Sequence, residues 1–495
     1  MKNTKKRFAA IFRLKKIVII VAAAIMLSLF SWMLISYEIQ IYDDKSILEW
    51  VKKKEMKGEF ILKNGTVWLD TDGAPIQAHG GGIIFDEKTS KYYWYGEDKT
   101  EPNLPGKTCV PVTGVHCYSS KDLKNWKNEG IALPVFNNPQ FADGTEPSDG
   151  LPLYIAEDSA VYKNSPLPAF SMKEKDPVPE NGTVKSPSAT LIKHNDANRI
   201  AELNALYEGL TYAQKKEMYL NFNWNKVVER PKVLYNPHTG KYVMRWHHDG
   251  DKAGEYAAAE AGAAVSDSPA GPFKYLYTSR LPNTAEGLEQ QGMLRDMTLF
   301  ADDDGKAYLI YSSENNKTTV IMLLDESYTA PAADKYGNSV EGVHWIRAHS
   351  DEREAPAVFK NNGAYYMITS GLTGWAPNPA KYHVAKNGIF GEWEDKGNPC
   401  AGRKADVTYN AQSTFVLEYR GEDGKTVPGK YILLLDRWSP NNLSQSTYVW
   451  LPLTVDAENQ TLKLTYHAYL TKEAILGLPS PPLTLKEKIK AFFGI

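Results

Sequence analysis

The sequence predicts an all-β fold, a five-bladed β-propeller, on three observations. A strand-like phrase of aromatic and aliphatic residues recurs five times, at roughly 60-residue intervals after the second copy. Turn-forming residues precede several copies, and a polar turn with an aromatic anchor follows three of them. The copies lie at 91–97, 240–246, 305–311, 363–369 and 429–435. A turn that leads into an aromatic strand at a regular period is typical of propellers, so five copies predict five blades.

The copies also predict where a site would lie. In a propeller, ligands bind at the mouth of the central channel, which the innermost strand of each blade lines. We therefore expect functional side chains in the short segments before each aromatic strand. Outer strands are expected at 115–126, 263–273 and 384–393, because each range combines strand formers, a polar turn and an aromatic residue.

The N-terminus predicts a membrane anchor. Residues 1–16 are basic, and residues 17–36 form an uncharged apolar stretch of about 20 residues, enough to cross a bilayer as a transmembrane helix. The basic flank predicts that 1–16 stay in the cytoplasm, that 37–58 form a stalk, and that the rest of this single-pass protein of the cell membrane is extracellular. A cleaved signal peptide, which would make the protein secreted, is the alternative. No small-x-small cleavage site follows Ser36.

The composition excludes some partners. A net charge of −2 provides no basic field for nucleic acid. Aromatic residues make up 12 % of the chain, which suits either stacked blades or contacts to sugar faces. Cys109, Cys117 and Cys400 show neither metal-ligand spacing nor a disulfide framework, and both a Cys109–Cys117 bridge and unpaired thiols remain open. We expect a monomer without a cofactor.

The propeller is predicted to span 59–470, with an insertion at about 134–225 between the first two blades. This insertion is rich in proline and contains a helical patch at 195–219. Four apolar residues there have helical spacing: Leu203, Leu206, Tyr207 and Leu210. The insertion either walls one side of the central cleft or is a surface excursion. The tail, 471–495, contains a short basic amphipathic helix that either contacts lipid or packs on the propeller.

Three carboxylates and one amide occupy matched positions before the aromatic strands. Glu229, Asp296, Glu354 and Gln412 precede the second to fifth copies and are 67, 58 and 58 residues apart. The corresponding segment of the first blade, 77–82, reads Gln-Ala-His-Gly-Gly-Gly. Carboxylates that converge on one axis repel each other, so at least one keeps its proton near neutral pH. Glycoside hydrolysis requires such a proton donor.

A purely structural reading of the same residues is the alternative. Glu229 and Glu354 are followed or preceded by arginines, Arg230 and Arg353, and could form ion pairs with them. An unpaired charge ahead of an inward-facing strand is costly to bury. Three acidic residues at matched positions in three blades nevertheless favour a site.

Nine motifs resemble those of glycoside hydrolase family 43, and within it the exo-β-1,3-galactanase branch. The resemblance runs from about Trp68 to Leu453, interrupted by the insertion. It is carried by 77–82, 93–97, 117–120, 229–233, 295–300, 353–357, 373–378, 412–414 and 448–453. The resemblance implies a five-bladed propeller and inverting hydrolysis, in agreement with the repeat count.

The resemblance also implies roles for individual residues. Glu354 resembles the general acid of the family, and Asp296 the carboxylate that tunes the pKa of the acid and holds the sugar. The usual base is an aspartate in the first blade, but 77–82 contains none. The galactanase branch shares this departure and uses a glutamine at the position of Gln412 to hold the attacking water. Because an ordinary amide is a very poor base, an imidic-acid tautomer of Gln412 and a contribution from Glu229 both remain open.

Further substrate contacts follow from the resemblance. Glu97, Glu229 and Tyr256 resemble residues that contact sugar hydroxyls in the branch. Thr373 and Trp375 belong to the 373–378 motif, and Trp375 either offers an aromatic face to a sugar or packs in the core.

Two segments resemble cation sites. His79 precedes three glycines, so the backbone there can approach a ligand closely, and we count it among the substrate contacts. A hydrogen-bonded structural histidine and a ligand of a structural cation on the propeller axis are the alternatives. The acidic run 302–305 lacks the ligand spacing of a calcium loop, so we predict a β-turn there and no metal site.

Together these observations predict a membrane-anchored, exo-acting, inverting glycosidase that releases galactose from β-1,3-galactan, the backbone of arabinogalactan-type glycans. An α-L-arabinofuranosidase or a β-xylosidase, both common in the wider family, is one rival. A non-catalytic carbohydrate-binding propeller is another, which the missing aspartate in the first blade supports. The presence of both Glu354 and Asp296 argues against that rival, since binding alone needs no acid with a raised pKa.

Overall fold

The computed structural model describes residues 48–55, 57, 59–104, 106–142, 146–163, 196–250, 256–285 and 291–478. The chain divides into two compact units, one of Met1–Ile61 with Thr471–Ile495 and one of Leu62–Leu470. The predicted cytoplasmic segment 1–16, the anchor 17–36 and the C-terminal amphipathic helix lie outside the described residues. Of the predicted stalk, residues 48–55 are helical. Within the described ranges, no helix is long and apolar enough to cross a membrane.

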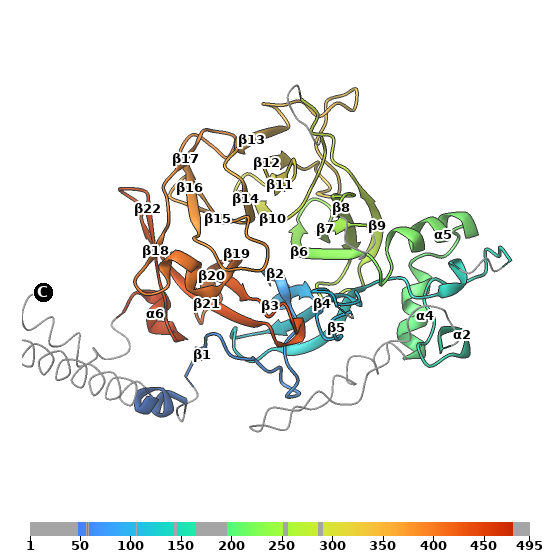
Figure 1. Cartoon of the computed structure of the whole chain (residues 1–495), viewed down its shortest axis with the longest axis horizontal. Helices are drawn as coiled ribbons and strands as arrows, with labels where there is room; N and C mark the ends of the chain where they lie inside the picture. Colours follow the sequence, from blue (N-terminus) through green and yellow to red (C-terminus); the bar gives the residue numbers. More distant parts are fainter. Residues whose placement is uncertain are drawn as a thin grey trace, which may run out of the picture. The chain divides into compact units, whose positions relative to one another are not determined.

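Five sheets of the larger unit are arranged around a centre (Figure 1). Each sheet is an antiparallel meander. The first sheet contains β2 (His79–Asp86), β3 (Lys91–Glu97), β4 (Gly114–Ser120) and β5 (Lys127–Pro134). The second contains β6 (Val227–Asn236), β7 (Lys241–Asp249), β8 (Glu260–Ser266) and β9 (Lys274–Ser279). The third sheet contains β10 (Met297–Ala301), β11 (Ala307–Ser313), β12 (Thr318–Leu323) and β13 (Trp345–His349). The fourth contains β14 (Arg353–Asn361), β15 (Ala364–Gly371), β16 (Lys381–Ala385) and β17 (Trp393–Asp395). The fifth is β19 (Gln412–Arg420), β20 (Thr426–Arg437), β21 (Thr447–Asp456), β22 (Thr461–Thr465), extended by β18 (Cys400–Ala401), which pairs parallel to β22.

The innermost strands close the sheets into a ring. Strand β2 contacts β6, β6 contacts β10, β10 contacts β14, β14 contacts β19, and β19 returns to β2. The fold is therefore the predicted five-bladed β-propeller, and each of the five aromatic phrases falls on the second strand of its blade. The three predicted outer segments begin in the third strands β4, β8 and β16 and end where the fourth strands β5, β9 and β17 start.

Burial explains why the second strands are so apolar. In β11, every residue is buried, because the strand lies inside a blade that is covered on both faces by its neighbours. The run 302–305 before it forms the predicted β-turn, with the Gly305 amide donating to the Asp302 carbonyl at 3.0 Å. Gly305 has a φ of +80°, which a side chain would oppose.

Asn64, which precedes the first blade, is hydrogen-bonded to the fifth blade and to the segment that follows it. The Asn64 side-chain amide donates to the carbonyls of Trp450 and His467 at 2.8 and 2.9 Å, and its oxygen accepts from the Trp450 amide at 2.8 Å. The remaining short elements are β1 (Ile61–Lys63) and β23 (Tyr469–Thr471), which form a two-stranded sheet, and η2 (Ala405–Asn410), η3 (Leu443–Gln445) and α6 (Lys472–Leu476). The cysteines are free thiols, so the Cys109–Cys117 bridge does not form.

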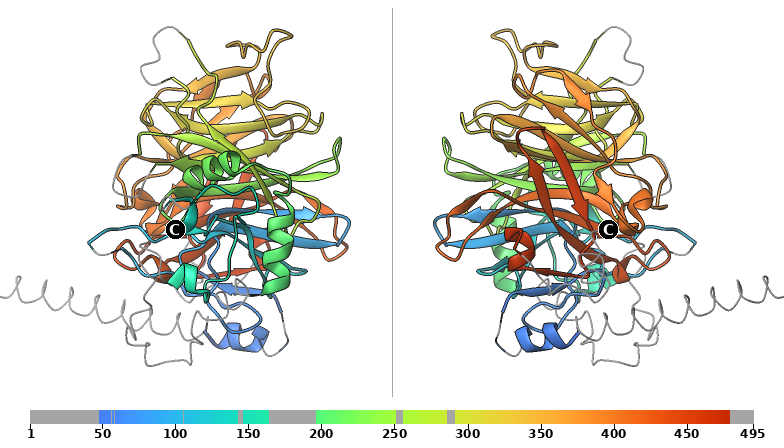
Figure 2. Two further views of the ribbon diagram at one scale, coloured as in Figure 1. Left: turned by 90° about the vertical axis from the view of Figure 1, so that its right-hand side faces the viewer. Right: turned by 90° about the vertical axis from the view of Figure 1, so that its left-hand side faces the viewer.

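The segment between the first two blades contains the helices that the sequence predicted. Its elements are η1 (Pro139–Phe141), α2 (Ala160–Lys163), α4 (Ala197–Ala205) and α5 (Tyr212–Asn221). The patch predicted at 195–219 is thus two helices, because Thr211 starts a new one with a capping box to Gln214. Figures 1 and 2 show α4 and α5 at the outer edge of the propeller.

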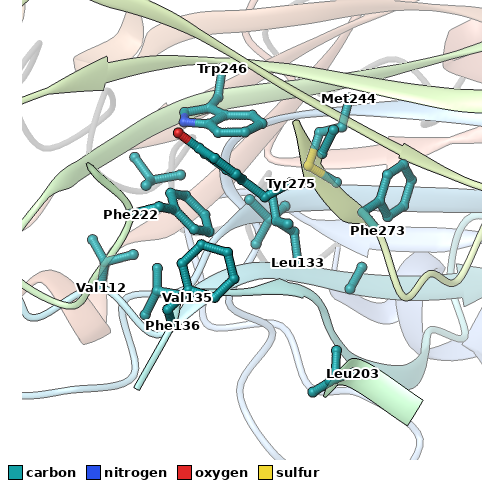
Figure 3. Packing of buried hydrophobic residues seen from close by; sticks show 14 of the residues in the cluster. Val112, Leu133, Val135, Phe136, Leu203, Phe222, Met244, Trp246, Phe273 and Tyr275 are labelled. Carbon is teal, nitrogen blue, oxygen red and sulfur yellow. The ribbon is translucent and has the colours of Figure 1, made fainter. Parts of the chain in front are cut away.

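Aromatic packing joins this segment to the second blade. Figure 3 shows Phe222 beside Tyr275 and Trp246, and the ring centroids of Phe222 lie 5.0 Å from those of Tyr275 and 5.4 Å from those of Trp246. The Tyr275 amide on the outermost strand β9 donates to the Tyr207 hydroxyl at 2.8 Å. The segment therefore covers the exposed edge of the second blade, which would otherwise offer unpaired backbone groups.

Candidate active site

One cavity of about 400 Å³ collects side chains from the innermost strands. Glu229 on β6, Asp296 directly before β10, Glu354 on β14 and Gln412 at the start of β19 all line it. The matched positions in the sequence therefore correspond to one place in the fold. None of the described residues of the 134–225 insertion lines this cavity, so the expectation that the insertion walls the cleft does not hold for the part described.

Backbone irregularities aim these side chains at the cavity. The strand register shifts between Glu229 and Lys232, between Glu354 and Ala357, and between Ser413 and Phe415. Arg230 and Ala355 have φ values of +50° and +56° at two of these positions. Such bulges re-aim side chains at the ends of strands and are common beside active sites.

The Gln412 amide is held by four hydrogen bonds. Its oxygen accepts from Arg230 Nη2 at 2.6 Å and from Trp438 Nε1 at 3.0 Å. Its nitrogen donates to Glu354 Oε1 and to the Ser370 hydroxyl, both at 2.9 Å. Because arginine and tryptophan only donate, these partners fix which end of the amide is the oxygen.

Glu354 is suited to keep a proton at neutral pH. Burial and the negative charge of Asp296 raise the pKa of Glu354 to about 8, although Arg230 and the bond from Gln412 oppose the rise. Since Oε1 already accepts from Gln412, the proton belongs on Oε2. Glu354 can therefore donate a proton from one defined oxygen.

Asp296 and Arg230 form an ion pair beneath the acid. Arg230 Nε lies 2.9 Å from Asp296 Oδ2, and the same oxygen accepts from the Ala355 amide at 3.1 Å. Arg230 therefore reaches another blade instead of pairing with Glu229. Arg353 donates to Thr369 Oγ1 at 3.1 Å and to carbonyl oxygens. Ion pairs between Glu229 and Glu354 and their neighbouring arginines, the structural alternative, are wrong.

Glu229 is held ionised in the same cavity. Burial opposes its charge, but the hydrogen bond and charge of His247 outweigh that effect and lower the pKa of Glu229 to about 2. His247 Nδ1 lies 3.3 Å from Glu229 Oε2, and the Tyr256 hydroxyl donates to Oε1 at 3.0 Å. Burial would lower the pKa of His247, yet Asp249 and Glu229 raise it to about 9.

Three of the predicted substrate contacts also line the cavity. Glu97 accepts from Lys99 at 2.6 Å and from the Arg230 amide at 2.9 Å. Tyr256 holds Glu229, as described above. Trp375 is 38 % exposed, and its Nε1 donates to Thr108 Oγ1 at 3.1 Å, so the alternative of a core tryptophan is wrong.

Thr373 and His79 do not line the cavity. The Thr373 hydroxyl donates to the Ala376 carbonyl in its own turn. The His79 ring is buried and stacks on Tyr448 with ring centroids 4.9 Å apart, and its Nε2 lies 3.4 Å from the Tyr448 hydroxyl. In the described part of the chain, His79 belongs to no group of three metal-ligating side chains.

Sequence reasoning did not assign Arg230, His247 or Trp438 to the site. Arg230 was visible in the 229–233 motif, but adjacency favoured Glu229 as its partner. His247 lies near the end of the second aromatic strand, β7, and Trp438 directly follows the fifth, β20. The repeat pattern predicted functional residues in the segments before these strands.

Comparisons with known proteins identify a family. The sequence model of "Glycosyl hydrolases family 43" matches residues 230–422. A family 43 β-1,3-galactosidase solved with galactodeoxynojirimycin is similar at 32 % identity and a TM-score of 0.57, covering 82 % of this chain and 99 % of its own. No curated protein matches the chain.

Two further solved structures are similar. An exo-β-1,3-galactanase from Clostridium thermocellum has 27 % identity and a TM-score of 0.55, over 83 % of this chain and 66 % of its own. An exo-β-1,3-galactanase from Phanerochaete chrysosporium solved with galactose has 26 % identity and a TM-score of 0.54, over 84 % of this chain and 70 % of its own.

Proposed function

This chain belongs to glycoside hydrolase family 43, and we propose that it is an exo-acting, inverting enzyme that releases galactose from the non-reducing end of β-1,3-galactan. The observation that carries the proposal is Glu354, a carboxyl group with a raised pKa whose proton is directed to one oxygen inside the cavity. The activities named for the similar structures supply the sugar and the linkage.

In the proposed reaction, a water molecule attacks the anomeric carbon of the terminal galactose from the face opposite the leaving group. The bond from that carbon to the glycosidic oxygen breaks, and Glu354 Oε2 gives its proton to the leaving oxygen. The attacking water loses a proton to a base. The products are α-galactose and a galactan chain that is one residue shorter.

We assign the base to Glu229 because Gln412 is poorly placed for the task. An imidic-acid tautomer carries a proton on the amide oxygen, but that oxygen faces the donors of Arg230 and Trp438 and has no acceptor there. Gln412 also touches Glu354 directly, whereas the acid and base of an inverting enzyme flank the sugar. Glu229 is an ionised carboxylate that lines the same cavity. Gln412 then orients the acid.

Azide tests this assignment. The small anion can replace the water as a nucleophile when the base is removed, and attack on the opposite face gives α-galactosyl azide. Glu229→Ala should lose activity and recover part of it with azide. Gln412→Ala should also lose activity, since the acid loses its orientation, but azide should not restore it. Azide rescue of Gln412→Ala alone would assign the base to Gln412 instead.

The remaining cavity residues are proposed to hold the substrate. Asp296 raises the pKa of Glu354, and Arg230 fixes Asp296 and Gln412 relative to each other. Glu97 and Tyr256 supply partners for sugar hydroxyls. The exposed face of Trp375 at the rim suits stacking on a sugar ring.

We also propose the domain arrangement that the sequence indicates: a cytoplasmic segment at 1–16, a membrane anchor at 17–36, a stalk at 37–58, and an extracellular glycosidase domain at 59–470. The support is the uncharged apolar stretch and its basic flank. The alternative is cleavage after the apolar stretch, which would give a secreted enzyme. N-terminal sequencing of the native protein distinguishes the two.

A substrate panel tests the activity. Wild-type enzyme and Glu354→Gln are incubated with β-1,3-galactan and with nitrophenyl galactoside, arabinofuranoside and xyloside. The proposal predicts that the wild type releases galactose from galactan and that Glu354→Gln does so far more slowly. Release of arabinose or xylose without galactose would identify the enzyme as an arabinofuranosidase or a xylosidase, and binding without turnover in the wild type would identify a carbohydrate-binding propeller.

A further inference from the structure

Two imidazoles and a carboxylate gather between the third and fourth blades, outside the cavity. His349 ends β13, Asp351 lies in the connection to β14, and His383 is on β16. One ligating atom of each lies within 4.8 Å of the others. None of the three lines the described cavity.

The hydrogen bonding of this cluster is incomplete. The side chains of His349 and His383 are 7 % and 2 % exposed. His349 Nδ1 and Asp351 Oδ1 face each other at 2.5 Å, whereas His349 Nε2 and His383 Nδ1 are buried without a hydrogen-bond partner among the described residues. Since buried polar atoms are nearly always hydrogen-bonded, two such atoms in one cluster indicate a ligand.

We propose that His349, Asp351 and His383 bind a divalent transition-metal ion. His349 Nδ1 lies 2.5 Å from Asp351 Oδ1 and His383 Nε2 lies 3.4 Å from Asp351 Oδ2, so both imidazoles approach the same carboxylate. Two imidazole nitrogens and one carboxylate oxygen are a donor set that Zn²⁺ accepts, with water as the fourth ligand. Calcium and magnesium prefer oxygen ligands throughout.

Two neighbouring groups decide how the ion binds. Lys381 Nζ lies 2.8 Å from Asp351 Oδ2 and 2.8 Å from Asp395 Oδ2, so its positive charge directs the ion to Oδ1, and Asp395 shares that charge. The rings of His349 and His383 stack with centroids 4.0 Å apart and planes 5° apart. Lone pairs of parallel rings do not converge, so one ring turns out of the stack when the ion binds.

The position of the site suggests its effect. The ion joins the last strand of one blade to the third strand of the next, and Asp351 lies three residues before Glu354. Metal binding should therefore stabilise the fold and the start of β14 without taking part in the reaction.

The test titrates the purified, untagged full-length chain, stripped with EDTA, with Zn²⁺ or Co²⁺. We expect one equivalent to bind, a rise in Tm, a Co²⁺ d–d absorption band, and altered imidazole ¹⁵N signals. His383→Gln and Asp351→Asn should lose the equivalent, while the exposed control His238→Gln keeps it. Metal binding, Tm and the absorption band are also measured on the wild-type chain, so the proposal can be tested even if a variant does not fold.

Three results would overturn the proposal. The first is a wild-type chain that binds no Zn²⁺ or Co²⁺, and the second is an equivalent that survives His383→Gln. The third is loss of the equivalent in Glu229→Gln but not in His383→Gln, which would move the ion to Glu229, His247 and Asp296 in the catalytic cavity.

Discussion

Asp296→Asn should move the alkaline limb of the pH–activity profile. In the wild-type site, burial and the charge of Asp296 raise the pKa of Glu354 from 4.5 to about 8. The substitution removes the negative neighbour and leaves Arg230 without its partner at 2.9 Å. Both changes favour ionised Glu354, so its pKa should fall.

The structure sets the scale of this effect. With a pKa of about 8, about 90 % of Glu354 is protonated at pH 7, against about 0.3 % at the ordinary value of 4.5. This ratio of about 300 corresponds to about 3 kcal/mol at 1.36 kcal/mol per tenfold change. Burial is the larger cause and persists in the variant, so the limb should move only partway, from about pH 8 toward about pH 7.

The assay is kcat/KM for galactose release between pH 5 and 10. An acid catalyst must be protonated, so activity falls as pH rises through its pKa, and Asp296→Asn should lose more activity at pH 8 than at pH 6. Asp304→Asn, an exposed carboxylate of the same blade, is the control and should leave the limb unchanged. A limb that stays near pH 8 in Asp296→Asn would refute the influence of Asp296 on the acid.

Three further outcomes follow. Glu354→Gln should lower kcat by about 10²–10⁴-fold on galactan with little change in binding, and less on an activated nitrophenyl substrate; near-normal turnover of galactan would exclude it as the acid. Arg230→Lys should lower kcat more than it raises KM, because a lysine cannot hold Asp296 and Gln412 as the arginine fork does; unchanged kinetics would contradict that role. The full-length chain should be found in the membrane fraction, whereas a chain without residues 1–40 should be a soluble, active enzyme. Cell fractionation with an activity assay would show the difference.

The blades and the four inner-strand residues were predictable because both follow a period along the chain. The second strand of each blade is covered by the neighbouring blades, so its aromatic and apolar composition recurs along the chain. The segment before this strand lies at the central channel in every blade. This argument located Glu229, Asp296, Glu354 and Gln412 in one cavity without any knowledge of their contacts.

The pairings within the site carry no such period. Arg230 lies next to Glu229 in sequence, but its left-handed backbone and the neighbouring bulge turn it toward Asp296 and Gln412. Likewise, the glycines after His79 indicated a close backbone approach, yet the ring packs against Tyr448 outside the cavity. Bulges and side-chain directions depend on contacts between blades, which the sequence alone does not reveal.

Proton NMR during hydrolysis of β-1,3-galactan tests the central claim most directly. The anomeric signals of galactose distinguish the first product before mutarotation mixes the two anomers. An exo-acting, inverting enzyme with Glu354 as its acid should release α-galactose first, with no intermediate oligosaccharides, and Glu354→Gln should release it about 10²–10⁴-fold more slowly. First release of β-galactose, or of internal oligosaccharides in place of galactose, would contradict the account.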